Sequence, residues 1–137
     1  MVVLVGPGQG GDSPMFPLLL AAVRVPRRGG GRPRTRPVSV AADKAYSARA
    51  HRDLLRRRGI IAVIPERADQ VSNRRNRGSA GGRPVRYDTA AYRGRNVVER
   101  SYNRFKQWRG LASRYDKHAV LFRGAAVLRS IIIWLTD

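Results

Sequence analysis

Residues 38–64, VSVAADKAYSARAHRDLLRRRGIIAVI, decide the fold class of this chain. The two ends of this stretch, Val38–Ala42 and Ile60–Ile64, are apolar and rich in β-branched residues, a composition that predicts short buried strands. The residues between them predict a helix, which Ser47 can cap and Gly59 can end. The sequence therefore predicts an α/β fold whose strands are buried on both faces.

The N-terminal residues predict a further strand and a further helix. Met1–Val5 is an apolar run followed by glycines, as expected of a short buried strand. Met15–Val25 supplies the apolar face of a helix that Asp12 or Ser13 can cap. Three short strands interleaved with helices are therefore expected.

The C-terminal half predicts a loop and two long helices. Glu66–Tyr87 is rich in Arg, Asn and Gly and is expected to be a loop. Asp88 or Thr89 can cap a helix that continues to the residue before Gly110. A last amphipathic helix is expected over Lys117–Leu135.

The charge of the chain is its most informative bulk property. Lys and Arg total 28 against 9 Asp and Glu, a net charge of +19. A surface of this charge attracts polyanions, and nucleic acid above all. Residues 26–37 hold arginines, prolines and glycines but no acid, which predicts an exposed basic loop. A GC-rich genome would also raise arginine use without any functional cause.

The rarer residue types exclude several kinds of site. The absence of cysteine rules out a disulfide scaffold, a zinc–thiolate centre and a cysteine nucleophile. Two histidines, His51 and His118, cannot form a histidine-rich metal cluster. The apolar stretch Ala119–Leu135 is interrupted by Arg123 and Arg129 and is expected to fall short of the ~20 apolar residues of a membrane span. No membrane partner is therefore expected. The chain is expected to lie in a cytoplasmic, reducing compartment.

The helix after Asp88 carries the groups with the most chemistry. On a projection of about 100° per residue, four reactive or charged side chains share an arc of about 60°. These are Tyr92, Arg95, Glu99 and Lys106. Taken alone, this pattern is that of an exposed helix whose Glu99 pairs with Arg95 and Asn103. The opposite, mostly apolar face is expected to pack on the core and consists of Val97, Val98, Phe105, Trp108 and Ala112.

The spacing of these four residues is specific. The pattern Tyr-x2-Arg-x3-Glu-x6-Lys resembles the signature around the final acidic residue of DDE transposases from bacterial insertion sequences. Residues 42–66 resemble the region of the second catalytic aspartate in the same transposases, with Asp43 in that position. Gly10–Pro14 and Gly31–Arg34 share the resemblance, which covers nearly the whole chain.

The resemblance implies an RNase H-like fold and metal-dependent DNA cleavage and strand transfer. Asp43 and Glu99 would be two of three carboxylates that hold two Mg²⁺ or Mn²⁺ ions roughly 4 Å apart. The predicted position of Asp43 agrees, because ligands bind at the carboxyl ends of strands in α/β sheets. Arg95 and Lys106 would clamp the DNA backbone, and Tyr92 would support or stack on a nucleotide or pack beneath the helix. The residues expected to bind DNA are Arg27, Arg28, Arg32, Arg34, Arg95, Arg100 and Lys106.

The sequence departs from the family at the first acid, which normally lies on a first strand upstream of Met1–Val5. Asp12 is expected to cap a helix instead. The other candidates start helices or follow no strand; they are Asp53, Asp69, Asp88 and Asp116. Residues 1–137 are therefore expected to be the C-terminal portion of a transposase catalytic domain, without the first catalytic strand and the N-terminal DNA-binding region, and inactive alone.

Two origins of such a chain stay open at this point. It would be a degraded copy, or a second reading frame joined to an upstream one by frameshifting. The expected partners are insertion-sequence ends and target DNA, the upstream-frame product, and further copies of the chain on DNA. A different class, a non-enzymatic basic protein of the ribosomal or nucleoid kind, fits the composition but does not account for the signature spacing.

Overall fold

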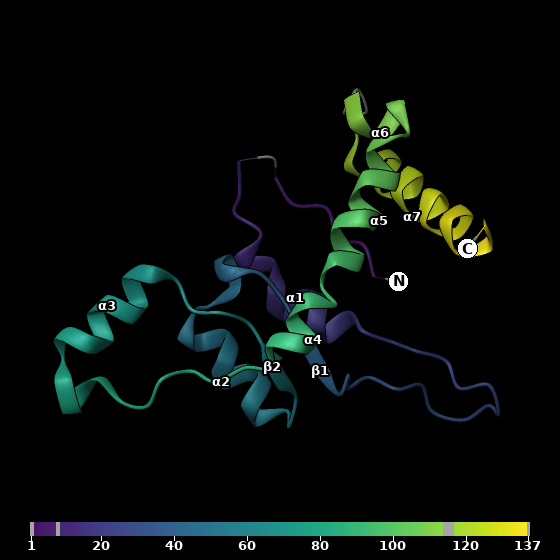
Figure 1. The fold of residues 1–137 in the computed structure, drawn as a ribbon. Helices are drawn as coiled ribbons and strands as arrows, with labels where there is room; N and C mark the ends of the chain where they lie inside the picture. The colour runs from purple at the N-terminus through teal and green to yellow at the C-terminus, as the bar shows by residue number, and fades with distance from the viewer. Residues whose placement is uncertain (1, 8, 114–116, 137) are drawn as a thin grey trace.

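The computed structural model describes residues 2–7, 9–113 and 117–136, which form a mixed α/β structure that is mostly helical (Figure 1). Met1, at the start of the predicted first strand, and Asp116, one of the aspartates weighed as a metal ligand, lie outside the described residues. The elements in chain order are the 3-10 helix η1 (Ser13–Met15), α1 (Phe16–Ala22), β1 (Ser39–Ala41), the 3-10 helix η2 (Lys44–Tyr46), α2 (Arg49–Arg57), β2 (Ile61–Val63), α3 (Ala68–Asn76), the 3-10 helix η3 (Gly78–Gly81), α4 (Thr89–Arg93), α5 (Asn96–Lys106), α6 (Arg109–Ser113) and α7 (Ala119–Thr136).

The two strands form a parallel sheet joined by α2, and strands and helix lie in the segments that the sequence predicts. Ser39 pairs with Ile61, and Ala41 pairs with Val63. The helix is followed by Gly59, whose φ of 62° lies in the left-handed region that favours glycine. This strand–helix–strand unit confirms the α/β class and is consistent with an incomplete RNase H-like fold.

The start of α2 differs from the prediction. The helix begins at Arg49, and its N-cap residue, Ala48, has no side-chain oxygen to serve as a cap. Ser47, the predicted cap, is buried and ends η2 instead. The reason is that Asp43 starts η2 by accepting a hydrogen bond from the backbone N–H of Ala45, so one 3-10 turn precedes α2.

The core is small and lies where α1 and α2 pack against the sheet. Leu55 and Ile64 are completely buried. Ile61 is 60% exposed, so the prediction of strands buried on both faces is wrong. Side chains alternate between the two faces of a strand, and the element that approaches the open face of β2 is the five-residue α4. The core cluster consists of Phe16, Leu20, Leu55, Ile60 and Ile64.

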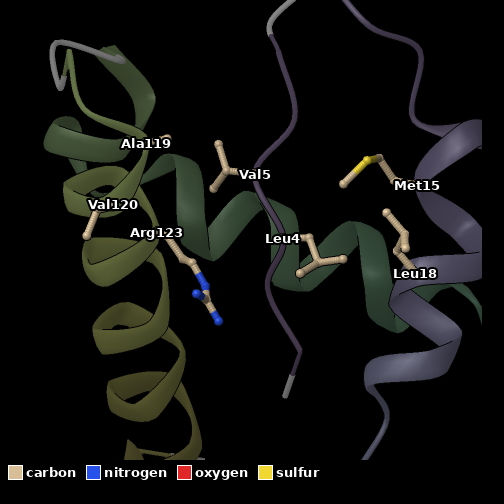
Figure 2. A pocket seen from close by; sticks show the side chains of 7 residues that line it. All are labelled: Leu4, Val5, Met15, Leu18, Ala119, Val120 and Arg123. Carbon is tan, nitrogen blue, oxygen red and sulfur yellow. The ribbon is translucent and has the colours of Figure 1, made fainter.

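The predicted first strand is not formed. Val2–Val5 has no strand partner in the described part of the chain and runs as an extended segment between α1 and α7 (Figure 2). Leu4 and Val5 of this segment line a shallow apolar groove together with residues of α1 and α7, among them Leu18 and Val120. Arg123 of α7 donates from Nε to the carbonyl of Val3 at 3.1 Å. The apolar run is therefore accommodated between helices instead of in a sheet.

The predicted loop over Glu66–Tyr87 contains α3 and η3, so that prediction is wrong. Two local interactions favour the helix. The side chain of Gln70 accepts a hydrogen bond from the backbone N–H of Arg67 at 3.4 Å, and Arg74 pairs with Glu66 across the helix start. No described residue of α3 is buried, so no apolar periodicity marks this helix in the sequence.

The predicted long helix is three helices. Asp88 caps the first one, as predicted, by accepting from the N–H groups of Ala90 and Ala91 at 2.8 and 3.0 Å. The first break follows at Gly94, where Val97 N–H bonds back only three residues, to the Gly94 carbonyl at 3.2 Å. The predicted breaker Gly110 lies inside α6. A projection that assumes one continuous helix therefore fails beyond residue 94.

The apolar side of this region does not pack on the central core. Val97 and Val98 are 56% and 49% exposed, which contradicts the prediction for that face. Phe105 and Trp108 are half-buried, because α5 and α6 pack on α7 instead. Figure 1 shows these three helices together, away from the sheet. Ala112 is exposed.

The last helix, α7, is close to its predicted bounds. Ala126, Ser130 and Ile133 are its buried residues, whereas Trp134 and Leu135 at its end are 78% and 81% exposed. Over 18 residues its mean hydropathy is 1.6, and 11% of that window is buried. By length and composition alone the helix could therefore cross a bilayer, which corrects the expectation that this segment is too short.

The two arginines of α7 are both engaged with the rest of the chain. Arg123 donates to the Val3 carbonyl of the N-terminal segment. Arg129 donates from Nε and Nη2 to the Arg104 carbonyl at 3.3 and 3.0 Å, and its guanidinium lies 6.0 Å from the centre of the Trp108 ring. In this structure both charges thus hold α7 to other protein segments.

Candidate functional site

Asp43 lies at the carboxyl end of β1, at the edge of the sheet where the sequence places it. Its side chain is exposed, and Oδ1 accepts a hydrogen bond from Ala45 N–H at 2.9 Å. The residue is therefore both a cap of η2 and a carboxylate at the strand edge where α/β sheets bind ligands.

Tyr46 lies in η2, next to the carboxyl end of β1. Its ring packs on Phe16 with a centroid separation of 5.7 Å. Burial raises the pKa of the Tyr46 phenol, and electrostatic interactions with Asp12, Asp43 and Tyr102 raise this pKa further. The Tyr46 hydroxyl is therefore protonated at neutral pH.

Glu99 is in the first turn of α5 and is bound to Arg95. Arg95 Nη2 lies 2.6 Å from Glu99 Oε1, and the Glu99 side chain is 58% exposed. The Arg95 guanidinium also lies 5.5 Å from the centre of the Tyr92 ring, which meets Tyr87 edge-on at 5.6 Å. The structure therefore brings together Tyr92, Arg95 and Glu99, and it confirms the predicted Arg95–Glu99 pair.

The structure shows no direct contact between the two predicted metal ligands among the described residues. Asp43 accepts a hydrogen bond from Ala45 N–H, and the Glu99 carboxylate pairs with Arg95. That Asp43 and Glu99 share one site therefore stays a prediction.

Lys106 and Arg100 are the basic groups farther along α5. Lys106 is the last residue of the helix, and both side chains are exposed. Within the described residues neither makes an ion pair or a side-chain hydrogen bond, so both are available to an anion. The structure does not bring Lys106 to Glu99, because two helical turns separate the two residues.

Every arginine of the predicted basic loop, residues 26–37, is exposed. Figure 1 shows it leaving the end of α1, extending away from the sheet and returning to β1. One antiparallel bridge, between Val25 and Arg34, joins its two sides. The exposed residues predicted to bind DNA in it are Arg27, Arg28, Arg32 and Arg34.

The carboxylates of Asp43 and Glu99 are suitable ligands for a divalent cation, but they are too few to hold one. Asp43 and Glu99 offer hard oxygen ligands of the kind that Mg²⁺ prefers. Among residues 2–7, 9–113 and 117–136, no three His, Asp or Glu side chains lie close enough together to hold a metal ion. The described residues therefore show no complete metal site, and the metal-ligand roles of Asp43 and Glu99 stay predictions.

Asp12 behaves differently from its prediction as a helix cap. It occupies the N-cap position of η1, but its side chain makes no capping hydrogen bond. Its charge, like that of Asp43, contributes to the raised pKa of Tyr46.

Arg52 and Glu66 are two further residues near the sheet edge that the sequence did not single out. Arg52 donates from Nη2 to the carbonyl of Ile64 at 2.9 Å and from Nε to that of Ser47 at 3.4 Å. It thereby ties the end of β2 to the end of η2. Glu66 follows β2 as Asp43 follows β1, but its carboxylate is bound to Arg74, which lowers the Glu66 pKa.

The fold is a mixed α/β structure, consistent with a partial RNase H-like fold, with an acid at a strand end and a second acid on a basic helix. The chain belongs to the transposase DDE domain family, which matches residues 40–136. The matched range includes Asp43, Tyr92, Arg95, Glu99 and Lys106. The family is one of polynucleotidyl transferases that act on DNA. No curated protein and no solved structure shows significant similarity to the chain.

Proposed function

We propose that this chain is the C-terminal part of the catalytic domain of a bacterial insertion-sequence transposase, and that it contributes two of the three carboxylates for DNA cleavage and strand transfer. One observation carries the proposal: the family match begins in β1 and spans both Asp43 at the end of that strand and Glu99 on α5. The position of Asp43 after β1 of the parallel pair supports the proposal, because ligands bind at the carboxyl ends of strands in α/β sheets.

The roles of the residues follow from their chemistry. Asp43 and Glu99 are the metal ligands of the proposal, and the Mg²⁺ or Mn²⁺ ions would activate the attacking oxygen and stabilise the leaving oxygen. Arg95 holds Glu99 in place in the absence of DNA. Arg95 and Lys106 hold backbone phosphates beside the cut, because guanidinium and ammonium groups donate charge-assisted hydrogen bonds to phosphate. Tyr92 supports Arg95 through its ring.

The proposal includes a cytoplasmic location at the bacterial nucleoid. It also includes partners that complete the set of three carboxylates. A third carboxylate would come from the product of an upstream reading frame, and several copies of the complex would act on paired DNA ends. Alone, the chain binds DNA and does not cut it, since positioning of the ions is most of the catalysis of phosphoryl transfer.

A strand-cleavage assay with Mg²⁺ or Mn²⁺ tests this proposal. Wild type, Asp43→Ala and Glu99→Ala are incubated with labelled duplex DNA, and binding is followed in parallel by fluorescence anisotropy. We expect all three proteins to bind DNA and none to cut it. Cleavage by wild type that disappears in both variants would show that the chain holds a complete site, with Asp12 the first candidate for the third ligand. Absence of DNA binding by wild type would overturn the proposal altogether.

The net charge of +19 also supports a second function, a non-enzymatic basic DNA-binding protein. The two functions differ in their metal response. If Mn²⁺ strengthens DNA binding by wild type but not by Asp43→Ala or Glu99→Ala, the carboxylates work with a metal at the DNA. Equal Mn²⁺ response in all three proteins favours the binding protein.

A further inference from the structure

We propose that the arginine-rich segment 25–34, here called the arginine arm, inserts into the minor groove of A·T-rich duplex DNA. The inference rests on the proposed function, in which DNA is the partner. It adds which segment of the chain contacts the DNA and in which groove. The arm precedes the residues 40–136 that match the transposase family, so the family match does not account for it.

The base of the arm is fixed to the body of the protein. Val25 and Arg34 exchange two backbone hydrogen bonds, each of 2.9 Å. Just outside this bridge, Arg58 of α2 donates to the Leu20 carbonyl and to the Thr35 carbonyl, both at 3.2 Å. The two ends of the arm are therefore held together and held to α2, which limits the entropy lost when the arm is bound.

The tip of the arm is narrow. It turns through a hydrogen bond from Gly30 N–H to the Arg27 carbonyl at 3.1 Å. Gly30 and Gly31 have φ values of 77° and 85°, a backbone region that favours glycine. A Cβ at Gly29, Gly30 or Gly31 would meet nothing within 4 Å, so the tip is bare backbone surrounded by open space.

The arm is also a concentrated positive charge without internal compensation. It holds four exposed arginines and no acid. The ion pairs of the described residues all involve arginines of other segments, from Arg49 to Arg95. Pro26 and Pro33 restrict the two sides of the arm to extended backbone. The four arginines are Arg27, Arg28, Arg32 and Arg34.

The shape of the arm favours the minor groove over the major groove. A two-stranded β-ribbon fits the major groove, about 12 Å wide, but only one residue pair of this arm is bridged. The minor groove is about 6 Å wide, and narrow A·T-rich stretches have a strongly negative potential that attracts inserted arginines. Thin basic arms of other DNA-binding proteins use this groove. The glycine tip lets the backbone approach the groove floor, so that Arg28 and Arg32 on either side of it can enter.

Binding to two duplexes of equal length, one with an A·T tract and one of G·C pairs only, tests the inference. Three variants of the full chain are compared with wild type by fluorescence anisotropy. Arg28→Ala/Arg32→Ala removes the two arm charges beside the tip, Arg28→Lys/Arg32→Lys keeps the charge but removes the planar group, and Arg83→Ala/Arg86→Ala removes two exposed charges elsewhere. Circular dichroism checks that each variant is folded.

We expect wild type to prefer the A·T duplex by about tenfold, the discrimination that one or two groove contacts supply. Netropsin, which fills the A·T minor groove, should remove this preference. The arm alanine variant should lose the preference, the lysine variant should keep part of it, and the Arg83/Arg86 variant should lose affinity equally for both duplexes. Wild type that binds both duplexes alike would overturn the arm inference and leave the proposed function standing, whereas wild type that binds neither would overturn the proposed function itself.

Discussion

Arg95 Nη2 lies 2.6 Å from Glu99 Oε1, and the two residues are one helical turn apart. The proposed reaction needs the same Glu99 carboxylate as a ligand of a metal ion. The pair has the weaker of the two orientations on a helix, with the basic residue N-terminal to the acid. The Glu99 side chain is 58% exposed, so water competes for it. In the proposed reaction, Glu99 would exchange Arg95 for a cation while Arg95 turned to a DNA phosphate.

Replacement of Arg95 tests this exchange. Arg95→Ala should leave the melting temperature nearly unchanged, because exposed ion pairs contribute little to stability. The same variant should bind duplex DNA several-fold more weakly, since a phosphate contact is lost. Arg93→Ala, which removes an exposed arginine of α4, is the matched control. A large drop in melting temperature for Arg95→Ala alone would show that the pair is structural.

The salt dependence of DNA binding tests the contribution of the α5 helix. Each neutralised phosphate should contribute about −0.9 to the slope of log K against log salt concentration. Arg100→Ala/Lys106→Ala should therefore reduce the magnitude of the slope by about 1.8. Affinity that does not change between low and moderate salt would contradict a phosphate-dominated mode of binding.

Part of the fold and part of the site could be predicted from the sequence. The apolar runs of residues 38–42 and 60–64 correctly predicted the two strands, and the cap at Asp88 and the pair of Arg95 with Glu99 were also correct. These features depend on neighbours in the sequence. The break at Gly94 could not be predicted, because glycine is tolerated within helices and here only the local hydrogen bonds show that one ends.

The missed features depend on contacts between distant segments. Arg52 reaches carbonyls at the ends of η2 and β2, and no pattern along α2 distinguishes it from the other arginines there. Asp12 approaches Tyr46 only through the way the N-terminal segment lies on the fold. Val2–Val5 has the composition of a strand, but a strand needs a neighbouring strand to pair with.

Arg52 should be important for stability even though it is not a metal or DNA ligand. Arg52→Ala removes the charged hydrogen bonds to the Ile64 and Ser47 carbonyls. The free energy of unfolding should fall by about 2 kcal/mol, the usual cost of losing such a bond to a charged group. Arg49→Ala, on the exposed side of the same helix, should change it by less than about 0.5 kcal/mol. Urea denaturation of both variants measures the difference, and equal losses would refute the bridging role of Arg52.

Acid should weaken the structure through Glu66. The hydrogen bond from Arg74 lowers the pKa of the Glu66 carboxyl in the folded state, although burial raises it in part. A group with a lowered folded pKa stabilises the protein above its unfolded pKa, near 4.3, and this stabilisation is lost as the pH falls through the folded value. Glu66→Gln should therefore be less stable than wild type at neutral pH and lose less stability below about pH 4. Parallel pH–stability curves for the two proteins would contradict this role of Glu66.

The distance between positions 43 and 99 tests the central claim, that Asp43 and Glu99 belong to one site. Because the chain has no cysteine, Asp43→Cys/Glu99→Cys can carry two nitroxide labels without other changes. The dipolar broadening of the electron paramagnetic resonance spectrum then reports the separation, and Asp69→Cys/Glu99→Cys is the control pair. We predict a separation of roughly 10 Å between positions 43 and 99, as required of ligands around two ions about 4 Å apart. A separation of twice that value or more would place the two acids in different regions of the protein and contradict a shared active site.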